Sequence, residues 1–187
     1  MGHSQADKAA SRERILSLAS AQIRKEGLES LSVGKLMGKA GLTHGGFYGQ
    51  FASKDDLAAE ATARVLGNRG WQERLTGKAN PSFADVVRGY LSPRHRDDPG
   101  TGCLIAALGS DAARQPRAIR RALTDGFRVR LDAWLKLVPG RSMAARREKA
   151  LVTMATLVGA LIIARAVDDP ALSDEVLEAT ATELRRR

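Results

Sequence analysis

The amino-acid sequence predicts an all-α protein, and three observations support this prediction. Alanine, leucine and arginine are frequent while aromatic residues make up only 4% of the chain, a composition that favours helices over sheets. No segment alternates apolar and polar residues for long enough to form a half-buried strand. Apolar residues instead recur at three- and four-residue spacing between glycine, proline and serine signals. We expect about nine helices, arranged as an N-terminal three-helix head followed by a C-terminal helical region.

The first helix is predicted over residues 12–26. Ile15, Ala19 and Ile23 lie four residues apart and therefore share one face of a helix. Gly27 follows them and suits the end of that helix.

Two short helices joined by a glycine turn are predicted next. The first has apolar residues at positions i, i+3, i+4 and i+7, namely Val33, Leu36, Met37 and Ala40. Gly41 suits the left-handed conformation that ends a helix sharply. Thr43 can cap the second helix, whose buried side would carry Phe47 and Phe51. This arrangement is the helix-turn-helix pattern, whose second helix enters a DNA major groove.

Serine caps and turn residues place the remaining helices. Ser53 with Asp56, and Ser82 with Asp85, have the spacing of capping boxes that open helices. The stretch from Pro93 to Gly102 has the composition of a surface loop. The later helices are expected over residues 82–91, 102–115, 116–138, 142–167 and 173–185.

The stretch from Ala150 to Ala164 contains fifteen residues without a charge, bracketed by Lys149 and Arg165. A membrane span needs about 20 residues, so we expect a buried or interfacial helix and no membrane association. The first residues have no apolar core, and we therefore expect no signal peptide. A single cysteine gives no disulfide framework. These features favour a cytoplasmic protein.

The net charge of +9 supports nucleic-acid binding only locally. Residues 1–60 hold 8 Lys/Arg against 7 Asp/Glu, so most of the basic surplus lies in the rest of the chain. Residues 30–54, however, contain Lys35, Lys39 and Lys54 and no acidic residue. The face expected to meet DNA is therefore positive.

The segment from Arg12 to Leu57 resembles the DNA-binding domain of TetR-type transcriptional regulators. One uninterrupted register carries the resemblance, through RERIL at residues 12–16, Ser32-Val33, Ala40 to Thr43, Phe47-Tyr48, Phe51, Ser53-Lys54 and Leu57. Residues 102–115 are similar to a segment of one branch of that family. The chain departs from the family pattern at Met37, where a small residue is usual, and at Gly49, where a long polar residue is frequent. Because Gly45 and Gly46 add two more glycines, we expect a recognition helix that is marginally ordered without DNA.

The resemblance implies a dimeric repressor that binds a palindromic operator in double-stranded DNA and is released by a small-molecule effector. We expect a DNA-binding domain over residues 1–52, a helical ligand-binding and dimerisation domain over residues 53–187, and no cofactor. The residues expected to contact DNA lie at the start of the first motif helix, in the recognition helix and just after it: Ser32, Val33, Thr43, His44, Gly45, Tyr48 and Lys54.

Two further sets of residues follow from this expectation. The large or soft side chains of the middle helices are candidates for effector contact, namely Trp71, Phe83, Tyr90, Cys103, Leu104, Leu108, Phe127 and Trp134. Stripes on the last two helices are candidates for the dimer interface, namely Ala155, Gly159 and Ile163, and Leu177, Ala181 and Leu184.

Three alternatives remain open at the level of sequence. Cys103 could sense electrophiles or oxidants through its thiolate, although its apolar neighbours favour an inert thiol. A basic helical face could bind an acidic protein as an adaptor; its arginines are Arg117, Arg120, Arg121, Arg128 and Arg130. A small all-α enzyme finds little support, because the chain has no phosphate loop, nucleophile elbow or metal-ligand spacing among its histidines and cysteine.

Overall fold

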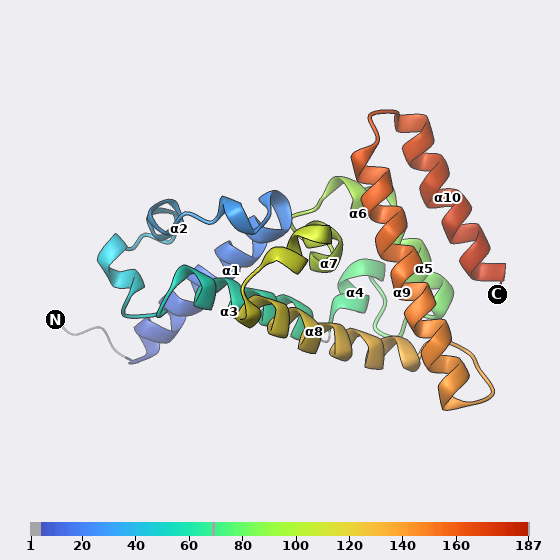
Figure 1. Cartoon of the computed structure of the whole chain (residues 1–187), viewed down its shortest axis with the longest axis horizontal. Coiled ribbons are helices and arrows are strands. Elements are labelled where there is room, and N and C mark those ends of the chain that lie inside the picture. The colour runs from blue at the N-terminus through green and yellow to red at the C-terminus, as the bar shows by residue number, and fades with distance from the viewer. Residues whose placement is uncertain (1–4, 69, 187) are drawn as a thin grey trace.

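The chain is described here by a computed structural model covering residues 5–68 and 70–186. Within these residues it forms ten α-helices and three short 3-10 helices, and no strand (Figure 1). The α-helices are α1 (Gln5–Glu26), α2 (Val33–Lys39), α3 (Lys54–Gly67), α4 (Trp71–Thr76), α5 (Phe83–Tyr90), α6 (Pro93–Asp97), α7 (Leu104–Leu108), α8 (Arg117–Leu135), α9 (Met143–Ala166) and α10 (Pro170–Arg186). The 3-10 helices are η1 (Leu28–Ser30), η2 (His44–Phe47) and η3 (Gly109–Arg114). The predicted all-α class is confirmed.

Helices begin where serine caps were predicted. The Ser53 side chain accepts a hydrogen bond from the Asp56 backbone N–H at the start of α3. At the start of α5, Ser82 and Asp85 form a complete capping box. The turn at Gly41 is also as predicted, because this residue adopts a left-handed φ of 72°.

Short helices account for most differences from the predicted elements. The stretch expected to be a loop after Pro93 contains α6, which begins with the Ser92 cap and a proline at its first position. The helix expected over residues 102–115 is divided into α7 and η3, because Gly109 has a positive φ of 46°. The recognition segment is the 3-10 helix η2 rather than an α-helix, consistent with the low helix propensity of Gly45 and Gly46.

Two clusters of buried side chains form the core. The first joins α1, α2, η2 and α3 in the head, and it continues into α7 and α8 through Leu104, Leu108 and Ile119. The second lies among α5, α8, α9 and α10. Figure 1 shows the head at one end, with α3 and α8 running side by side toward α9 and α10 at the other. The predicted domain boundary at residue 53 therefore falls within a continuous apolar contact, and it remains a prediction.

The apolar helix predicted around Ala150–Ala164 is α9. By length and composition it is the one described helix that could cross a membrane. It packs against α7, α8 and α10, and Ala150, Met154, Leu157 and Leu161 lie in the second core. A core position therefore accounts for its apolar composition.

The α10 face predicted for dimerisation requires a correction. Leu177, Ala181 and Leu184 are buried within the single chain, where α10 packs on α9 and α5. Helix periodicity identified the apolar face correctly but could not distinguish an internal neighbour from a second chain. On α9, in contrast, Ala155 and Ile163 are exposed and Gly159 is half-buried, so this stripe is open to a partner.

Candidate DNA-binding surface and ligand cavity

The head exposes most of the residues predicted to contact DNA. Thr43, His44, Gly45 and Lys54 are exposed, and 66% of the Tyr48 surface is accessible, an unusual fraction for an aromatic residue. Ser32 and Val33 are half-buried at the start of α2. The Val33 side chain packs against the head core, so the part of Val33 that is available at the surface is its backbone.

Two hydroxyl groups at helix starts are not used as caps. Ser32 and Thr43 occupy the N-cap positions of α2 and η2, but neither side chain makes a capping hydrogen bond. A serine or threonine in this position normally satisfies a free backbone N–H of the first turn. Both the hydroxyls and the backbone N–H groups at these two helix starts are therefore free to meet phosphate oxygens.

Aromatic contacts hold the recognition segment in place. The Phe47 ring is fully buried and stacks on Phe51 with a centroid distance of 5.6 Å. Tyr48 packs edge-on against Phe47 at 5.2 Å, and His44 lies beside Tyr48 at 6.2 Å. Phe47 and Phe51 thus anchor a turn whose other side carries His44 and Tyr48 outward.

Two arginines of α1 contact α2 and the residues that follow the recognition segment. The Arg14 guanidinium donates to the Ala40 carbonyl at the end of α2, at 3.0 Å. Arg12 lies over the Phe51 ring at 4.6 Å and pairs with Glu60 of α3. The side-chain oxygen of Gln50, which follows the recognition segment, is buried.

The main cavity lies where the head meets the C-terminal helices, and its volume is about 440 Å³. Residues from α1, α3, α4, α5, α7, α8 and α9, and from the segment around α6, line it. A volume of this size is typical of sites for small organic ligands. Five of the eight predicted contact residues line it: Trp71, Tyr90, Cys103, Leu104 and Trp134. Phe83, Leu108 and Phe127 do not; Leu108 belongs to the first core, whereas Phe83 and Phe127 pack against the second.

The arginines of the cavity were not predicted. Arg24, Arg74, Arg94 and Arg130 line it together with a single acid, Asp98. Arg130 is the clearest case, since the sequence placed it on an exposed basic face. It lies instead at i+3 from Phe127 and i−4 from Trp134, on the inward side of α8. That spacing was the signal that could have identified it.

Arg130 is held by the protein backbone and by an indole ring. Its guanidinium donates to the Val65 carbonyl at 2.8 Å and to the Asn68 carbonyl at 3.2 Å, and it lies 4.8 Å from the centre of the Trp71 ring. Burial is the main reason why its pKa is lowered to about 10. The group therefore keeps its charge at neutral pH.

The Tyr90 hydroxyl and His95 form the polar part of the wall. The hydroxyl is buried and has no oxygen or nitrogen partner. Burial first, and then the adjacent Cys103 thiol, raise the pKa of Tyr90. The Cys103 backbone N–H donates to His95 Nε2 at 3.0 Å, so the ring proton lies on Nδ1 and is donated to the Tyr90 carbonyl at 2.7 Å. Burial lowers the pKa of His95, which favours this neutral form.

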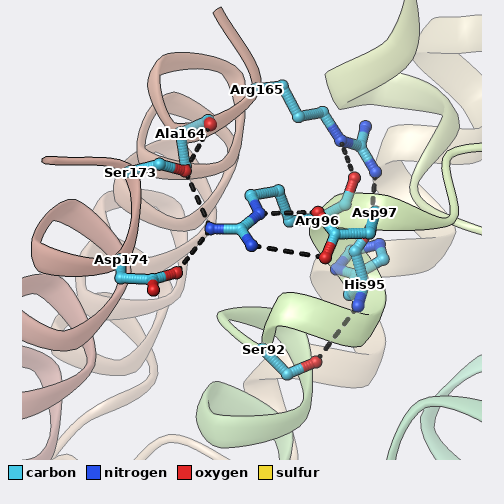
Figure 2. A network of polar contacts seen from close by, with 8 residues as sticks. All are labelled: Ser92, His95, Arg96, Asp97, Ala164, Arg165, Ser173 and Asp174. Atoms are coloured by element: carbon cyan, nitrogen blue, oxygen red, sulfur yellow. Dashed lines mark hydrogen bonds and ion pairs between the residues drawn. The ribbon is translucent and has the colours of Figure 1, made fainter. Parts of the chain in front are cut away.

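A polar network ties α6 to both α9 and α10 (Figure 2). Arg165 of α9 donates to the carbonyls of His95 and Arg96 at 2.7 and 3.0 Å. The Arg96 side chain reaches α10, where it bonds Ser173 and Asp174 at 2.9 and 2.6 Å. The cavity wall that contains His95 is thereby tied to both C-terminal helices.

The head is tied to the same segment from the opposite side. Arg24, near the end of α1, donates to the Gly100 carbonyl at 2.6 Å. Burial first, and then the nearby Arg74 charge, lower the pKa of Arg24. The segment that follows α6 therefore contacts the head and also lines the cavity.

Comparison with known proteins places this architecture in a known class. Residues 15–61 match the family model described as bacterial regulatory proteins, tetR family. No significant match was found among curated proteins. Metal-binding groups of three or more His, Cys, Asp or Glu do not occur among the described residues.

Several solved structures share the fold over nearly the whole chain. A TetR-family regulator from Cytophaga hutchinsonii is 22% identical, with a TM-score of 0.75 over 100% of this chain and 98% of that one. The reduced form of NemR from E. coli is 19% identical, with a TM-score of 0.74 over 95% and 96% of the two chains. A TetR-family regulator from Agrobacterium tumefaciens is 20% identical, with a TM-score of 0.72 over 94% and 98%.

A helix-turn-helix head joined to a helical C-terminal region defines the class of helix-turn-helix transcriptional regulators. Residues 15–61 match the head of TetR-family regulators, and the whole chain has the fold of solved structures described as TetR-family transcriptional regulators.

Proposed function

We propose that the chain is a cytoplasmic, homodimeric repressor that binds a palindromic operator and is released when a small molecule occupies the cavity. The observation that carries the DNA-binding part is the exposed set Thr43, His44, Tyr48 and Lys54, presented on one compact unit with two uncapped helix starts. Hydroxyl, ammonium and helix N-terminal groups are those that bind phosphate oxygens of DNA.

The dimer is supported by the open face of α9. Val152 and Ile163 are exposed there, with Ala155 and the small Gly159 between them. Exposed apolar residues around small ones allow close contact with a second helix. A two-fold dimer would present two recognition segments to two half-sites, which is why we expect a palindrome.

Release by a ligand is supported by the contacts of Arg24. This residue lines the cavity, belongs to a head helix and bonds the Gly100 carbonyl beyond α6. A ligand that displaces this contact would change how the head is held relative to α9. The distance between the two recognition segments of a dimer would then change, and DNA affinity would fall.

The test is affinity selection of fragmented genomic DNA from the source organism. The wild type should enrich one palindromic sequence, and a Tyr48→Ala/Lys54→Ala double variant should lose that enrichment because two phosphate contacts are removed. Lys136→Ala, which removes a positive charge at the exposed end of α8, is the matched control and should enrich the same sequence. Failure of refolded, ligand-free wild type to enrich any sequence would contradict the proposal.

A second candidate function is sensing through Cys103. The thiol is half-buried rather than sealed in the core, and it lines the cavity beside the Tyr90 hydroxyl. A structural relative, NemR, is described in a reduced form. Alkylation with N-ethylmaleimide should then weaken operator binding by the wild type and leave a Cys103→Ser variant unaffected. Unchanged affinity of the fully alkylated wild type would eliminate this function.

A further inference from the structure

We infer that the cavity accepts an organic carboxylate, a compound with one anionic head group on an apolar body, in preference to neutral or cationic compounds. This inference rests on the proposed function in taking the cavity as the effector site, and it adds the chemical class of the effector. Three features of the cavity carry it: its charge balance, one buried donor without an oxygen or nitrogen partner, and the apolar side chains that make up much of its lining.

The charge balance of the lining is strongly positive. Four arginines face one aspartate, and His95 is neutral because Nε2 accepts a hydrogen bond. Arg24, Arg94 and Arg130 donate to backbone carbonyls, and among the described residues none of the four arginines forms an ion pair with a carboxylate. Arg24 and Arg130 are half-buried, whereas Arg74 and Arg94 are exposed at the cavity mouth. Charges removed from water are normally paired, so the two half-buried guanidinium groups lack a carboxylate partner.

The Tyr90 hydroxyl supplies the buried donor. Tyr90 is 6% exposed and lines the cavity, and its hydroxyl has no oxygen or nitrogen hydrogen-bond partner; the adjacent Cys103 thiol is only a weak one. Buried hydroxyls are nearly always hydrogen-bonded in folded proteins. Because its raised pKa keeps the proton on the oxygen, the group can donate to an anionic ligand. Arg130 lines the same cavity, so both groups can donate to a carboxylate bound there.

Much of the remaining lining is apolar and suits the body of such a ligand. It is formed by aromatic and aliphatic side chains, including Trp71, Leu75, Trp134, Met154, Leu157 and Val158. Trp71 and Trp134 lie against one another with ring centroids 5.9 Å apart. A flat or flexible hydrocarbon can therefore replace water against this wall while its carboxylate meets the arginines.

The test measures binding by calorimetry at pH 7, without DNA, using matched compounds. The probes are octanoate, dodecanoate and 3-phenylpropanoate, each compared with its own primary amide and with the primary amine of the same carbon skeleton. At least one acid should bind, and its amide and amine should bind about tenfold or more weakly, because only the acid offers charge-assisted hydrogen bonds to arginine.

Two cavity variants identify the groups that read the charge. Arg130→Gln should abolish the preference for acid over amide while leaving amide affinity unchanged, and Arg130→Lys should restore part of it. Tyr90→Phe should reduce the preference about threefold to tenfold without lowering the melting temperature, because it removes a hydroxyl that has no oxygen or nitrogen partner. Arg120→Gln, on the exposed face of α8, is the matched control and should bind as the wild type does.

Several results would overturn the inference: no acid binding, equal affinity for acid and amide, a preference for amines, or an unchanged preference in Arg130→Gln. The proposed function is tested separately by adding the same compounds to the operator complex. Acids that bind the protein but leave the operator complex intact would refute the effector role alone. Release of DNA by the amides and not by the acids would refute the carboxylate inference alone.

Discussion

The His95 side chain joins two segments of the cavity wall through its ring nitrogens. Its two ring nitrogens bond the Tyr90 carbonyl and the Cys103 N–H, so it joins the end of α5 to the start of α7. Gly102 has to be small for the same reason, since a Cβ at this position would lie 3.0 Å from the His95 ring. The neutral imidazole is therefore part of the structure of the wall.

The protonation of His95 predicts how stability depends on pH. Burial lowers its pKa in the folded protein below the ordinary value of 6.5, so the unfolded chain binds the proton more readily. Stability should be fully present above pH 6.5 and should fall as the pH drops from there toward the folded pKa. Thermal unfolding followed at intervals from pH 7.5 to pH 5 should show this decline.

The comparison variants for this experiment are His95→Gln and His44→Gln. The first removes the titrating group and should flatten the decline below pH 6.5, even though its overall stability is lower. The second changes an exposed histidine of the head and should follow the wild-type curve. An equally steep decline in His95→Gln would assign the pH dependence to other groups.

At the scale of helices, the close crossing of α3 and α8 is the most demanding contact. These two helices share more contacts than any other pair, and Gly126 of α8 faces Leu66 of α3. A Cβ placed on Gly126 would lie 2.2 Å from the Leu66 Cβ, which no real pair of atoms tolerates. The absence of a side chain at this position therefore sets the distance between the two helices.

Gly126→Ala should destabilise the protein by about 1–3 kcal/mol, because the helices must separate to accommodate the added methyl group. Gly38→Ala makes the same change in α2, where a Cβ would meet no atom within 4 Å. In Gly38→Ala only the higher helix propensity of alanine matters, and the free energy of unfolding should rise by up to about 1 kcal/mol. Urea unfolding of both variants measures these changes, and effects of the same sign would contradict the packing argument.

The elements that could be predicted are those whose boundaries depend on local sequence. Ser53, Ser82 and Ser142 each cap a helix as the sequence indicates, because capping requires only residues three positions away. Helices α4 and α6 were missed because six and five residues are too few to show a helical period.

The cavity could be predicted only in part for a different reason. Trp71, Tyr90 and Trp134 were identified by size, a property visible in the sequence. The inward direction of Arg130 depends on the rotation of α8 against α3 and on the position of the Trp71 ring, and both are set by contacts between distant parts of the chain. Long arginine side chains are normally exposed, so composition favoured the wrong face.

At the scale of the whole molecule, the open stripe on α9 makes a prediction about assembly. Within one chain, a Cβ at Gly159 would meet no atom within 4 Å, so a larger side chain fits the monomer. Gly159→Leu should therefore fold normally but keep two α9 helices apart. Analytical ultracentrifugation should find a dimer for the wild type and a monomer for the variant, with operator affinity reduced accordingly.

The matched control for assembly is Ala144→Leu, which adds bulk at the exposed start of the same helix. It should remain dimeric. A dimeric Gly159→Leu variant with wild-type circular dichroism would show that this stripe is not the interface.

The position of Arg24 has a consequence for the amount of ligand that induction requires. Arg24 of the head helix α1 lines the cavity. Under the proposed function, a ligand that weakens operator binding must be bound less tightly by the operator complex, by the same factor. Operator binding then lowers the affinity of the cavity for the ligand, although the two sites are separate. Promoters with stronger operators would need more ligand before transcription begins, so one regulator could switch on its target genes in sequence as the ligand accumulates.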